Sequence, residues 1–255
     1  MERTIIVTGA SSGVGFEIAS QLLKQGDTVI LLARRIETMT KLVEDYPAKG
    51  YVYTCDVSNS DAVKITITSI LEKFPRIDGV IHCAGFGLFE LAEKTPIKSV
   101  EGMLLTNVSG GIHINQLLLP RFKAQQAGHI MMVASVAGKL ATPKTSAYAA
   151  SKFAVIGYAN ALRMEVAADN IFVTTINPGP ITTPFFDIAD KEGTYLKDVA
   201  RFSLQPEVVA SKMIKLFGKR KRELTLPFTM ALGARLHSLF PRTVEWIAKP
   251  FFLKK

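Results

Sequence analysis

The sequence predicts a single α/β domain built on a doubly wound parallel sheet, and three observations support this prediction. Short apolar runs alternate with longer segments of helical periodicity, with no internal repeat or low-complexity linker before residue 218. The runs are apolar on both faces, as expected for strands that lie between two layers of helices. The chain has 255 residues, 48% of them hydrophobic and 21% charged, which is enough for one sizeable core.

The expected elements follow one another along the chain. Six runs of four to six residues are expected as strands: Thr4–Val7, Thr28–Leu32, Tyr51–Thr54, Gly79–His82, His129–Val133 and Ile171–Ile176. Among the helical segments between them are Gly15–Gln25, Asp61–Phe74 and Val100–Phe122. Such alternation places helices on both sides of a parallel sheet. Arg222–Leu226 is expected as the last strand, which Pro227 ends.

The composition excludes several classes of protein. Two cysteines cannot form a disulfide framework or a four-cysteine zinc site, and the four histidines lack the spacing of a metal site. No metal is therefore expected. The first residues enter a strand-like run without the apolar region of a secretory signal. No stretch of about 18 residues is both apolar and uncharged. We therefore expect a cytoplasmic globular protein.

The net charge of +9 is confined to one end of the chain. Residues 1–211 contain 20 basic and 20 acidic side chains, whereas residues 212–255 contain 11 basic and 2 acidic ones. We accordingly divide the chain into a main domain, residues 1–218, and residues 219–255, a last strand with a basic, hydrophobic C-terminal extension. A neutral body with a basic end is unlike a generally basic nucleic-acid binder, so no nucleic acid is expected as a partner.

A glycine-rich turn follows the first expected strand and leads into a helical pattern. It reads Thr8-Gly9-Ala10-Ser11-Ser12-Gly13-Val14-Gly15. Glycines allow the backbone to approach a pyrophosphate closely, and the following helix N-terminus offers N–H groups to the phosphates. An ordinary tight turn between strand and helix is the alternative. The position of the turn favours a Rossmann-type dinucleotide site made by Gly9, Ser11, Ser12, Gly13, Val14 and Gly15.

The end of the second expected strand predicts which cofactor is bound. A carboxylate there would bind the ribose hydroxyls of NAD(H) and repel a 2′-phosphate. This chain instead has Ala33-Arg34-Arg35, and two guanidinium groups pair well with a phosphate. The sequence therefore predicts a preference for NADP(H) over NAD(H) through Arg34 and Arg35. A solvated pair of surface arginines is the alternative.

Reactive side chains are expected at the same edge of the sheet. Tyr148 and Lys152 lie four residues apart on one face of a helix, and Tyr148 comes thirteen residues after Ser135. Ser135 follows one expected strand, and Asn177-Pro178-Gly179-Pro180 follows the next. The carboxyl ends of parallel strands are where open α/β sheets bind their ligands. The segments that follow these strands should therefore converge on one site.

With these motifs the sequence resembles the short-chain dehydrogenase/reductase family, over nearly the whole chain to about residue 218. The resemblance implies a catalytic tetrad of Asn107, Ser135, Tyr148 and Lys152, with Asn107 holding a water that passes protons to Lys152. It also implies further cofactor contacts, from Asp56 and Val57 beside the adenine, from Ala84, Gly85, Asn107, Tyr148 and Lys152, and from Pro178, Gly179, Ile181 and Thr183 around the nicotinamide.

The implied reaction interconverts a carbonyl and an alcohol by hydride transfer. Tyr148 would be the acid in reduction and the base in oxidation, with Ser135 holding the carbonyl oxygen. A phenol has a pKa near 10, and the Lys152 ammonium would lower it by favouring the phenolate. Two alternatives stay open: a nucleotide-binding, non-catalytic, membrane-associated regulator, and a reductase of 3-oxoacyl groups on a carrier.

The chain departs from the family pattern just before Ala84. The family usually has two asparagines where this chain has His82 and Cys83. We expect His82 to replace a hydrogen bond that bridges two stretches of backbone. Cys83 is expected to be a buried small side chain rather than a redox switch.

The segment Thr182–Phe202 corresponds to the family's substrate lid. Its aromatic residues favour an apolar substrate, although ordinary lid packing would explain them as well: Phe185, Phe186, Tyr195 and Phe202. Other residues are expected to border the pocket: Gly87, Leu88, Ala137, Gly138, Leu140 and Thr142.

The extension beyond Pro227 mixes large apolar side chains with lysines and arginines. It is similar in style to family members that act on lipids and steroids at membranes. Peripheral membrane contact through residues 219–255 is one interpretation. An oligomer interface, packing over its own pocket, and docking of an acidic acyl carrier protein are the others. The family resemblance implies a homodimer or homotetramer that pairs through the helices holding Asn107 and Tyr148.

Overall fold

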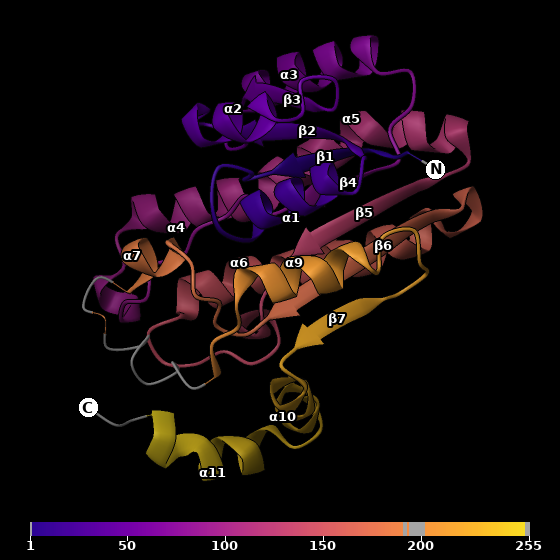
Figure 1. The fold of residues 1–255 in the computed structure, drawn as a ribbon. Coiled ribbons are helices and arrows are strands. Elements are labelled where there is room, and N and C mark those ends of the chain that lie inside the picture. The colour runs from indigo at the N-terminus through magenta and orange to yellow at the C-terminus, as the bar shows by residue number, and fades with distance from the viewer. Residues whose placement is uncertain (1, 191–192, 194–201, 253–255) are drawn as a thin grey trace.

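A seven-stranded sheet forms the centre of the molecule. The computed structural model describes residues 2–190, 193 and 202–252, and its strands run in the order β3-β2-β1-β4-β5-β6-β7. Every neighbouring pair is parallel. Helices cover both faces of this sheet (Figure 1). The prediction of a Rossmann-type doubly wound α/β fold is confirmed.

The strands lie within two residues of their expected bounds. They are β1 Thr4–Thr8, β2 Thr28–Ala33, β3 Gly50–Thr54, β4 Gly79–His82, β5 Gly128–Val133, β6 Ile171–Pro178 and β7 Glu223–Leu226. The expectation of full burial is wrong for β3, whose residues are half-buried or exposed. The reason is that β3 is the edge strand of the sheet and pairs only with β2.

The helices fill the intervals between the strands. They are α1 Gly13–Lys24, α2 Glu37–Glu44, α3 Ser60–Lys73, α4 Ile97–Leu104, α5 Gly110–Gln125, α6 Ser146–Glu165, α7 Phe185–Ala189, α9 Pro206–Ile214, α10 Phe228–Leu239 and α11 Pro241–Phe252. The segment expected as one helix, Val100–Phe122, is divided. A π-helical turn, η2 Leu105–Ser109, separates α4 from α5 and contains Asn107. Such turns insert an extra residue and recur at functional sites.

Alternating strand residues build two separate cores. In β1, Ile6 points to a core shared with α3, α5 and α6, whereas Ile5 and Val7 point to a core shared with α1 and α9. The same alternation continues in β4, where Val80 and Ile81 face opposite layers. This period of two explains why the strands are apolar on both faces. The two cores fix the sheet rigidly and leave its carboxyl edge for ligands.

A buried histidine attaches the last strand to the sheet. The Gly218 N–H donates to Nδ1 of His129 (2.9 Å), so the other ring nitrogen, Nε2, carries the proton towards Thr174 Oγ1 (2.9 Å). The Thr174 hydroxyl in turn donates to the Lys221 carbonyl (2.5 Å). These three bonds hold the turn before β7 against β5 and β6.

The C-terminal hairpin, which we define as α10 and α11, lies below the carboxyl edge of the sheet (Figure 1). Its inner face is packed on the domain, because a Cβ on Gly179 would lie only 2.5 Å from Met230 Sδ, and Ala234 is 2% exposed. The outer face of α10 is apolar and exposed at Phe228, Leu232, Leu236 and Leu239, and Phe240, directly after the helix, is exposed as well. In the described part of the chain, no helix has both the length and the hydropathy to cross a membrane.

Candidate active site

The glycine turn between β1 and α1 forms the floor of the site. Gly9 has a φ of +66°, and a Cβ on it would lie 2.7 Å from the Ala84 backbone nitrogen, so only glycine fits. Ser12 is extended and exposed, and its side chain caps no helix N–H group. The first N–H groups of α1 therefore remain available to an anion such as a phosphate.

The loop after β6 lies against this turn. A Cβ on Gly13 would be 3.3 Å from Cγ2 of Thr183, so the glycine turn and this loop are in contact. The Gly179 N–H donates to the Leu226 carbonyl (2.6 Å), and Ile181 forms an isolated parallel bridge with Leu204. The segment expected to hold the nicotinamide is thus fixed at two points by the residues that follow it in the chain.

The expected adenosine corner lies at the ends of β2 and β3. Arg34 and Arg35 follow β2 and are exposed, whereas Val57 is buried. Asp56 Oδ1 accepts bonds from the Ser58 N–H (3.0 Å) and hydroxyl (2.7 Å). Burial opposes ionisation of Asp56, but the two Ser58 bonds and the Arg34 charge outweigh it and lower the pKa of this carboxyl. The corner therefore carries a carboxylate and two cations.

Lys152 is buried where α6 passes the end of β5. Its Nζ donates to the Val133 carbonyl (2.9 Å) and lies 5.7 Å from the centre of the Tyr148 ring. Only 5% of Lys152 is exposed, and burial lowers the pKa of its amine to about 8. An amine with this pKa gains and loses its proton close to neutral pH.

Asn107 fastens the loop that follows β4. Its Oδ1 accepts from the Phe86 N–H (3.0 Å), and its Nδ2 donates to the Phe86 carbonyl (2.9 Å) and to Ser151 Oγ (3.0 Å). The Ser151 hydroxyl donates to the Tyr148 carbonyl (2.7 Å). The side-chain amide of Asn107 is thus engaged in holding protein groups, so holding a water would fall to other atoms of this residue. Phe86 and Ser151 are site residues that the sequence analysis missed.

A glycine keeps space open between these groups. A Cβ on Gly85 would lie 2.9 Å from Asn107 Oδ1 and 3.5 Å from Lys152 Nζ. Gly85 itself is exposed. Gly85 therefore leaves open space next to the Lys152 amine, and a side chain at position 85 would narrow this space.

Ser135 lies at the end of β5 and caps the short 3₁₀ helix η3 Val136–Gly138. Its Oγ accepts from the Ala137 N–H (3.0 Å) and donates to the Pro178 carbonyl (3.4 Å). The helix η3 packs tightly on α6, since a Cβ on Gly138 would lie 2.8 Å from the Lys152 carbonyl oxygen. Ser135, Lys152 and the loop after β6 are therefore joined in one structural unit.

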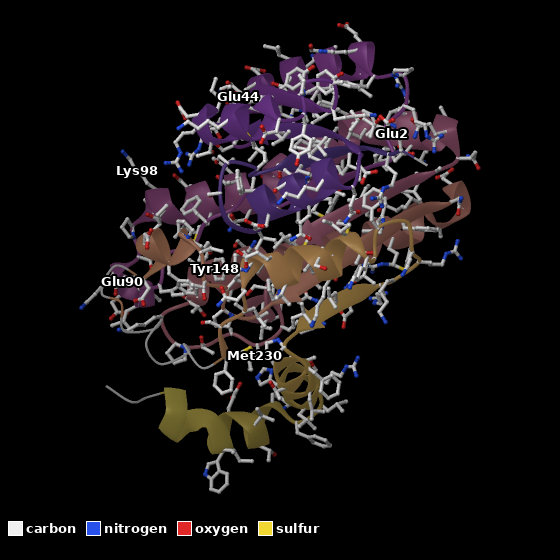
Figure 2. The ribbon with its side chains drawn as sticks, viewed as in Figure 1. Glu2, Glu44, Glu90, Lys98, Tyr148 and Met230 are labelled. Atoms are coloured by element: carbon white, nitrogen blue, oxygen red, sulfur yellow. The ribbon has the colours of Figure 1, made fainter. Side chains whose placement is uncertain are left out.

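Aromatic rings pack against the ring of Tyr148. The ring centres of Phe89 and Phe185 lie 5.6 and 5.7 Å from that of Tyr148, and Phe186 packs on Phe185 at 5.4 Å. Tyr148 is 7% exposed and lies at the carboxyl edge of the sheet (Figure 2). Two of the expected lid aromatics thus contact the tyrosine directly or through one ring. Phe202 is 39% exposed, and Tyr195 lies outside the described residues.

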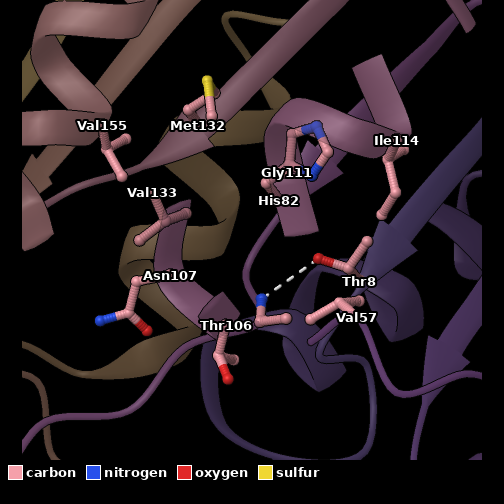
Figure 3. Close-up of a pocket in the computed structure, with 11 residues that line it drawn as sticks. Thr8, Val57, His82, Thr106, Asn107, Gly111, Ile114, Met132, Val133 and Val155 are labelled. Carbon is pink, nitrogen blue, oxygen red and sulfur yellow. Dashed lines mark hydrogen bonds between the residues drawn. The ribbon is translucent and has the colours of Figure 1, made fainter. Parts of the chain in front are cut away.

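A small cavity lies behind the tetrad, next to Asn107 and His82 (Figure 3). Its volume of about 10 Å³ is at the lower limit of the space that a single water molecule needs. His82 Nε2 bonds Asn115 Oδ1 on α5 (2.8 Å), and burial lowers the pKa of the imidazole to about 4. The expected backbone bridge by His82 is therefore replaced by a side-chain pair. Burial raises the pKa of the Cys83 thiol to about 12, which keeps it protonated.

The arrangement fits a dinucleotide at the carboxyl edge. The free first turn of α1, the glycine approaches and the lysine beside Gly85 offer groups for phosphate and sugar. Among the described residues, Asn177 Oδ1 is a buried oxygen without a hydrogen-bond donor. This oxygen lies on β6, directly before Pro178, in a residue that is 0% exposed.

The chain was compared with known proteins. The family model described as short chain dehydrogenase matches residues 3–192. The uncharacterized oxidoreductase YbbO of Escherichia coli (strain K12) is 31% identical over 241 residues, covering 92% of this chain and 88% of that protein. A serine dehydrogenase solved in its closed form with NADP+ is 28% identical, with a TM-score of 0.82 and coverage of 89% and 95%.

A second solved structure, a short-chain dehydrogenase from Streptomyces avermitilis, shares the fold with a TM-score of 0.85. It is 23% identical and covers 98% of both chains. The chain belongs to the short-chain dehydrogenase/reductase family and is an oxidoreductase.

Proposed function

We propose that the protein is an NADP(H)-dependent oxidoreductase that interconverts a carbonyl and an alcohol on a hydrophobic substrate, with Tyr148 as the acid and base. The observation that carries the proposal is the buried amine of Lys152, 5.7 Å from the Tyr148 ring and held by the Val133 carbonyl. A buried cation at this position favours the phenolate form of a neighbouring tyrosine. A lysine that only stabilised the fold would not have to be buried beside this tyrosine.

Each side chain has a distinct task in this proposal. The bound nicotinamide supplies or accepts the hydride. Tyr148 donates a proton to the carbonyl oxygen in reduction and removes it in oxidation. The Ser135 hydroxyl gives up its 3.4 Å bond to the Pro178 carbonyl and bonds the reacting oxygen instead. Lys152 stabilises the phenolate and binds the ribose, and Asn107 keeps the loop with Gly85 in position.

The preference for NADP(H) over NAD(H) is supported by the corner at the ends of β2 and β3. Arg34 and Arg35 are exposed there and can reach a 2′-phosphate. The serine dehydrogenase, 28% identical to this chain, was solved with NADP+. The hydrophobic character of the substrate is supported by the rings of Phe89 and Phe185 next to Tyr148, and by Phe186, which packs on both of them.

The experiment is an NADPH-oxidation assay with a panel of ketones, comparing the wild type with Tyr148→Phe. The control variant Tyr53→Phe removes a phenol from the half-buried edge strand β3 and should retain full activity. Full activity in Tyr148→Phe would refute the role of the tyrosine. Tight NADPH binding without turnover of any ketone would favour a non-catalytic regulator. Turnover only of carrier-linked 3-oxoacyl groups would favour the carrier reductase.

We also propose that the chain forms a homodimer or homotetramer. The helices that flank Asn107 and Tyr148 expose large apolar side chains: Leu104 at 40%, Leu105 at 46% and Phe153 at 46%. Such residues on adjoining helices are suited to a symmetric interface. Sedimentation velocity tests this, and a single monomer species at micromolar concentration would contradict it.

Residues 1–218 carry the reaction in this proposal, and residues 219–255 add a contact with the surface of a cytoplasmic membrane. The exposed outer face of α10 and the 11 basic against 2 acidic residues of segment 212–255 support that contact. Co-sedimentation with phosphatidylglycerol vesicles tests it. Salt-sensitive binding that is lost in Phe228→Ser with Phe240→Ser is expected, and absence of binding by the wild type would refute it.

A further inference from the structure

We propose that a cleft of about 530 Å³ beside the C-terminal hairpin binds the aliphatic chain of a long-chain carbonyl or alcohol substrate. The inference deepens the proposed function, on which it rests, by naming the substrate class. One wall of the cleft comes from the segment before α6 and the other from α10 and α11. The lining residues are Leu140, Ala141, Thr142, Pro143, Ser146, His237, Arg242, Val244, Glu245 and Trp246.

The wall of the cleft belongs to the same stretch of chain as the candidate active site. Ser146, on its wall, is the first residue of α6, and Tyr148 follows two residues later, about 3 Å further along the helix axis. Leu140 comes five residues after Ser135, directly after the turn of η3 that Ser135 caps. Ser135 and Tyr148 are not themselves part of the lining, so in the proposal the carbonyl lies between these two side chains and the aliphatic chain extends past Leu140 and Ser146 into the cleft.

The chemistry of the lining favours an apolar occupant. Leu140, Pro143 and Val244 present aliphatic surface, and Trp246 is 76% exposed although it lines the cleft. His237 and Glu245 bond each other (His237 Nε2 to Glu245 Oε1, 3.2 Å), so their polar atoms do not require a ligand. The volume lies within the usual range for small-molecule sites, and covering such apolar surface drives binding.

Arg242 is the other charged group of the lining, and it is exposed. A guanidinium at this position can remain in water while its methylene groups lie along a bound chain. The hairpin itself is anchored, because Met230 packs on Gly179 of the loop expected to hold the nicotinamide. The second wall of the cleft is thereby attached to the catalytic domain.

The chain carries its own reporter for this cleft, since Trp246 is its single tryptophan. The binding experiment titrates 2-dodecanone, kept below its solubility limit, into the full-length protein and follows the tryptophan emission. A saturable blue shift of the emission is expected, because the aliphatic chain of the ketone replaces water around the exposed indole of Trp246. Absence of a shift with 2-dodecanone would overturn the proposal, and so would a shift seen only with phosphatidylglycerol vesicles, which would assign Trp246 to the membrane.

A matched pair of variants on α11 locates the binding. Val244→Gln places a polar group in the cleft, whereas Ile247→Gln changes a neighbouring residue that is 57% exposed and outside the lining. Val244→Gln should weaken the titration at least tenfold and Ile247→Gln should leave it unchanged. If both variants weakened 2-dodecanone binding equally, the ketone would be binding to the general outer surface of α11, as a membrane or a partner protein would. That result would overturn the proposal that the cleft binds it.

The kinetic experiment measures KM with NADPH for 2-butanone, 2-hexanone, 2-octanone, 2-decanone and 2-dodecanone. Each methylene that enters the cleft should lower KM by about three- to fourfold, and Val244→Gln should flatten this dependence. Turnover with a KM independent of chain length overturns the cleft and leaves the proposed function standing. If no ketone is reduced but 2-dodecanone still shifts the tryptophan emission, the proposed function fails, whereas the binding of an aliphatic chain in the cleft stands.

Discussion

The catalytic edge and the C-terminal hairpin are built on opposite principles. At the edge, polar side chains are buried and held by backbone atoms: Lys152 is 5% exposed and bonds the Val133 carbonyl, and Asn107 is 6% exposed and bonds Phe86. In the hairpin, large apolar side chains are exposed, Phe228 at 75% and Trp246 at 76%. Proton transfer needs fixed geometry, which burial provides, whereas binding of an apolar group needs surface that is still uncovered.

The most severe test of the catalytic edge is Tyr148→Phe. Removal of the hydroxyl deletes the proposed proton donor and leaves the ring contacts with Phe89 and Phe185 intact. We expect the rate of ketone reduction to fall by about 10² to 10⁴, with a much smaller change in NADPH binding and with thermal stability retained. A loss of less than about tenfold would mean that another group transfers the proton.

The adenosine corner should show the next largest effect. In Arg34→Ala with Arg35→Ala, the affinity for NADPH should fall by about 10- to 100-fold, because charge-assisted bonds to the 2′-phosphate are lost. The affinity for NADH, which lacks that phosphate, should change little. Isothermal titration with both cofactors measures the ratio, and equal changes for NADPH and NADH would contradict the phosphate role.

The pH dependence of the reaction should follow the lysine. Burial lowers the pKa of Lys152 to about 8, so its ammonium is present below that pH and lost above it. The rate of reduction should therefore decline as pH rises through about 8, by about tenfold per unit once the amine is neutral. Initial rates from pH 6 to 10 check this, with circular dichroism as the control for folding. A constant rate up to pH 10 would exclude the lysine from this role.

The smallest expected effect separates the two faces of α10. Met230→Ala removes the contact of this side chain with Gly179 and should lower the free energy of unfolding by about 1–2 kcal/mol, because the site is only partly buried. Phe228→Ala, on the exposed face, should change it by less than about 0.5 kcal/mol. Urea denaturation of both variants measures the difference. Equal losses would mean that the outer face is already covered by protein.

The sequence predicted those parts of the molecule that a local rule determines. The strands follow from their apolar runs, and the glycine turn follows from the backbone approach that Gly9 makes to Ala84. The convergence of Ser135 with Pro178 follows from the rule that parallel strands end at one edge. Each of these inferences needs only a short segment and a general property of parallel sheets.

The missed residues depend on contacts between distant segments. Phe89 approaches Tyr148 from a segment 59 positions earlier, and no spacing rule connects the two. The π-helical turn around Asn107 has no sequence pattern that separates it from a continuous helix, so the bond to Phe86 could not be anticipated. Ser151 was the easiest of the missed residues to anticipate. It directly precedes Lys152 in α6, and both side chains are buried in the domain.

The C-terminal extension was the least predictable region, because its sequence does not show what its apolar residues contact. Its apolar residues agree with membrane contact, self-packing and an oligomer interface alike, and periodicity cannot choose among partners. The structure divides them: Met230 and Ala234 face the domain, and Phe228 and Leu232 face outward. Self-packing is therefore realised by one face of α10, and the other face is the subject of the proposals above.

The bonds from His129 to Gly218 and Thr174 make the edge of the sheet sensitive to acid. Burial lowers the pKa of His129 to about 4, as it does for His82. Above about pH 6.5 both imidazoles are neutral whether the chain is folded or not. As the pH falls from about 6.5 towards 4, the two imidazoles bind protons in the unfolded chain but stay neutral in the folded chain. Each histidine then lowers stability by about 1.4 kcal/mol per pH unit. Once His129 is protonated, Nδ1 no longer accepts the Gly218 N–H, so acid would detach first the turn that leads into β7 and the hairpin beyond it.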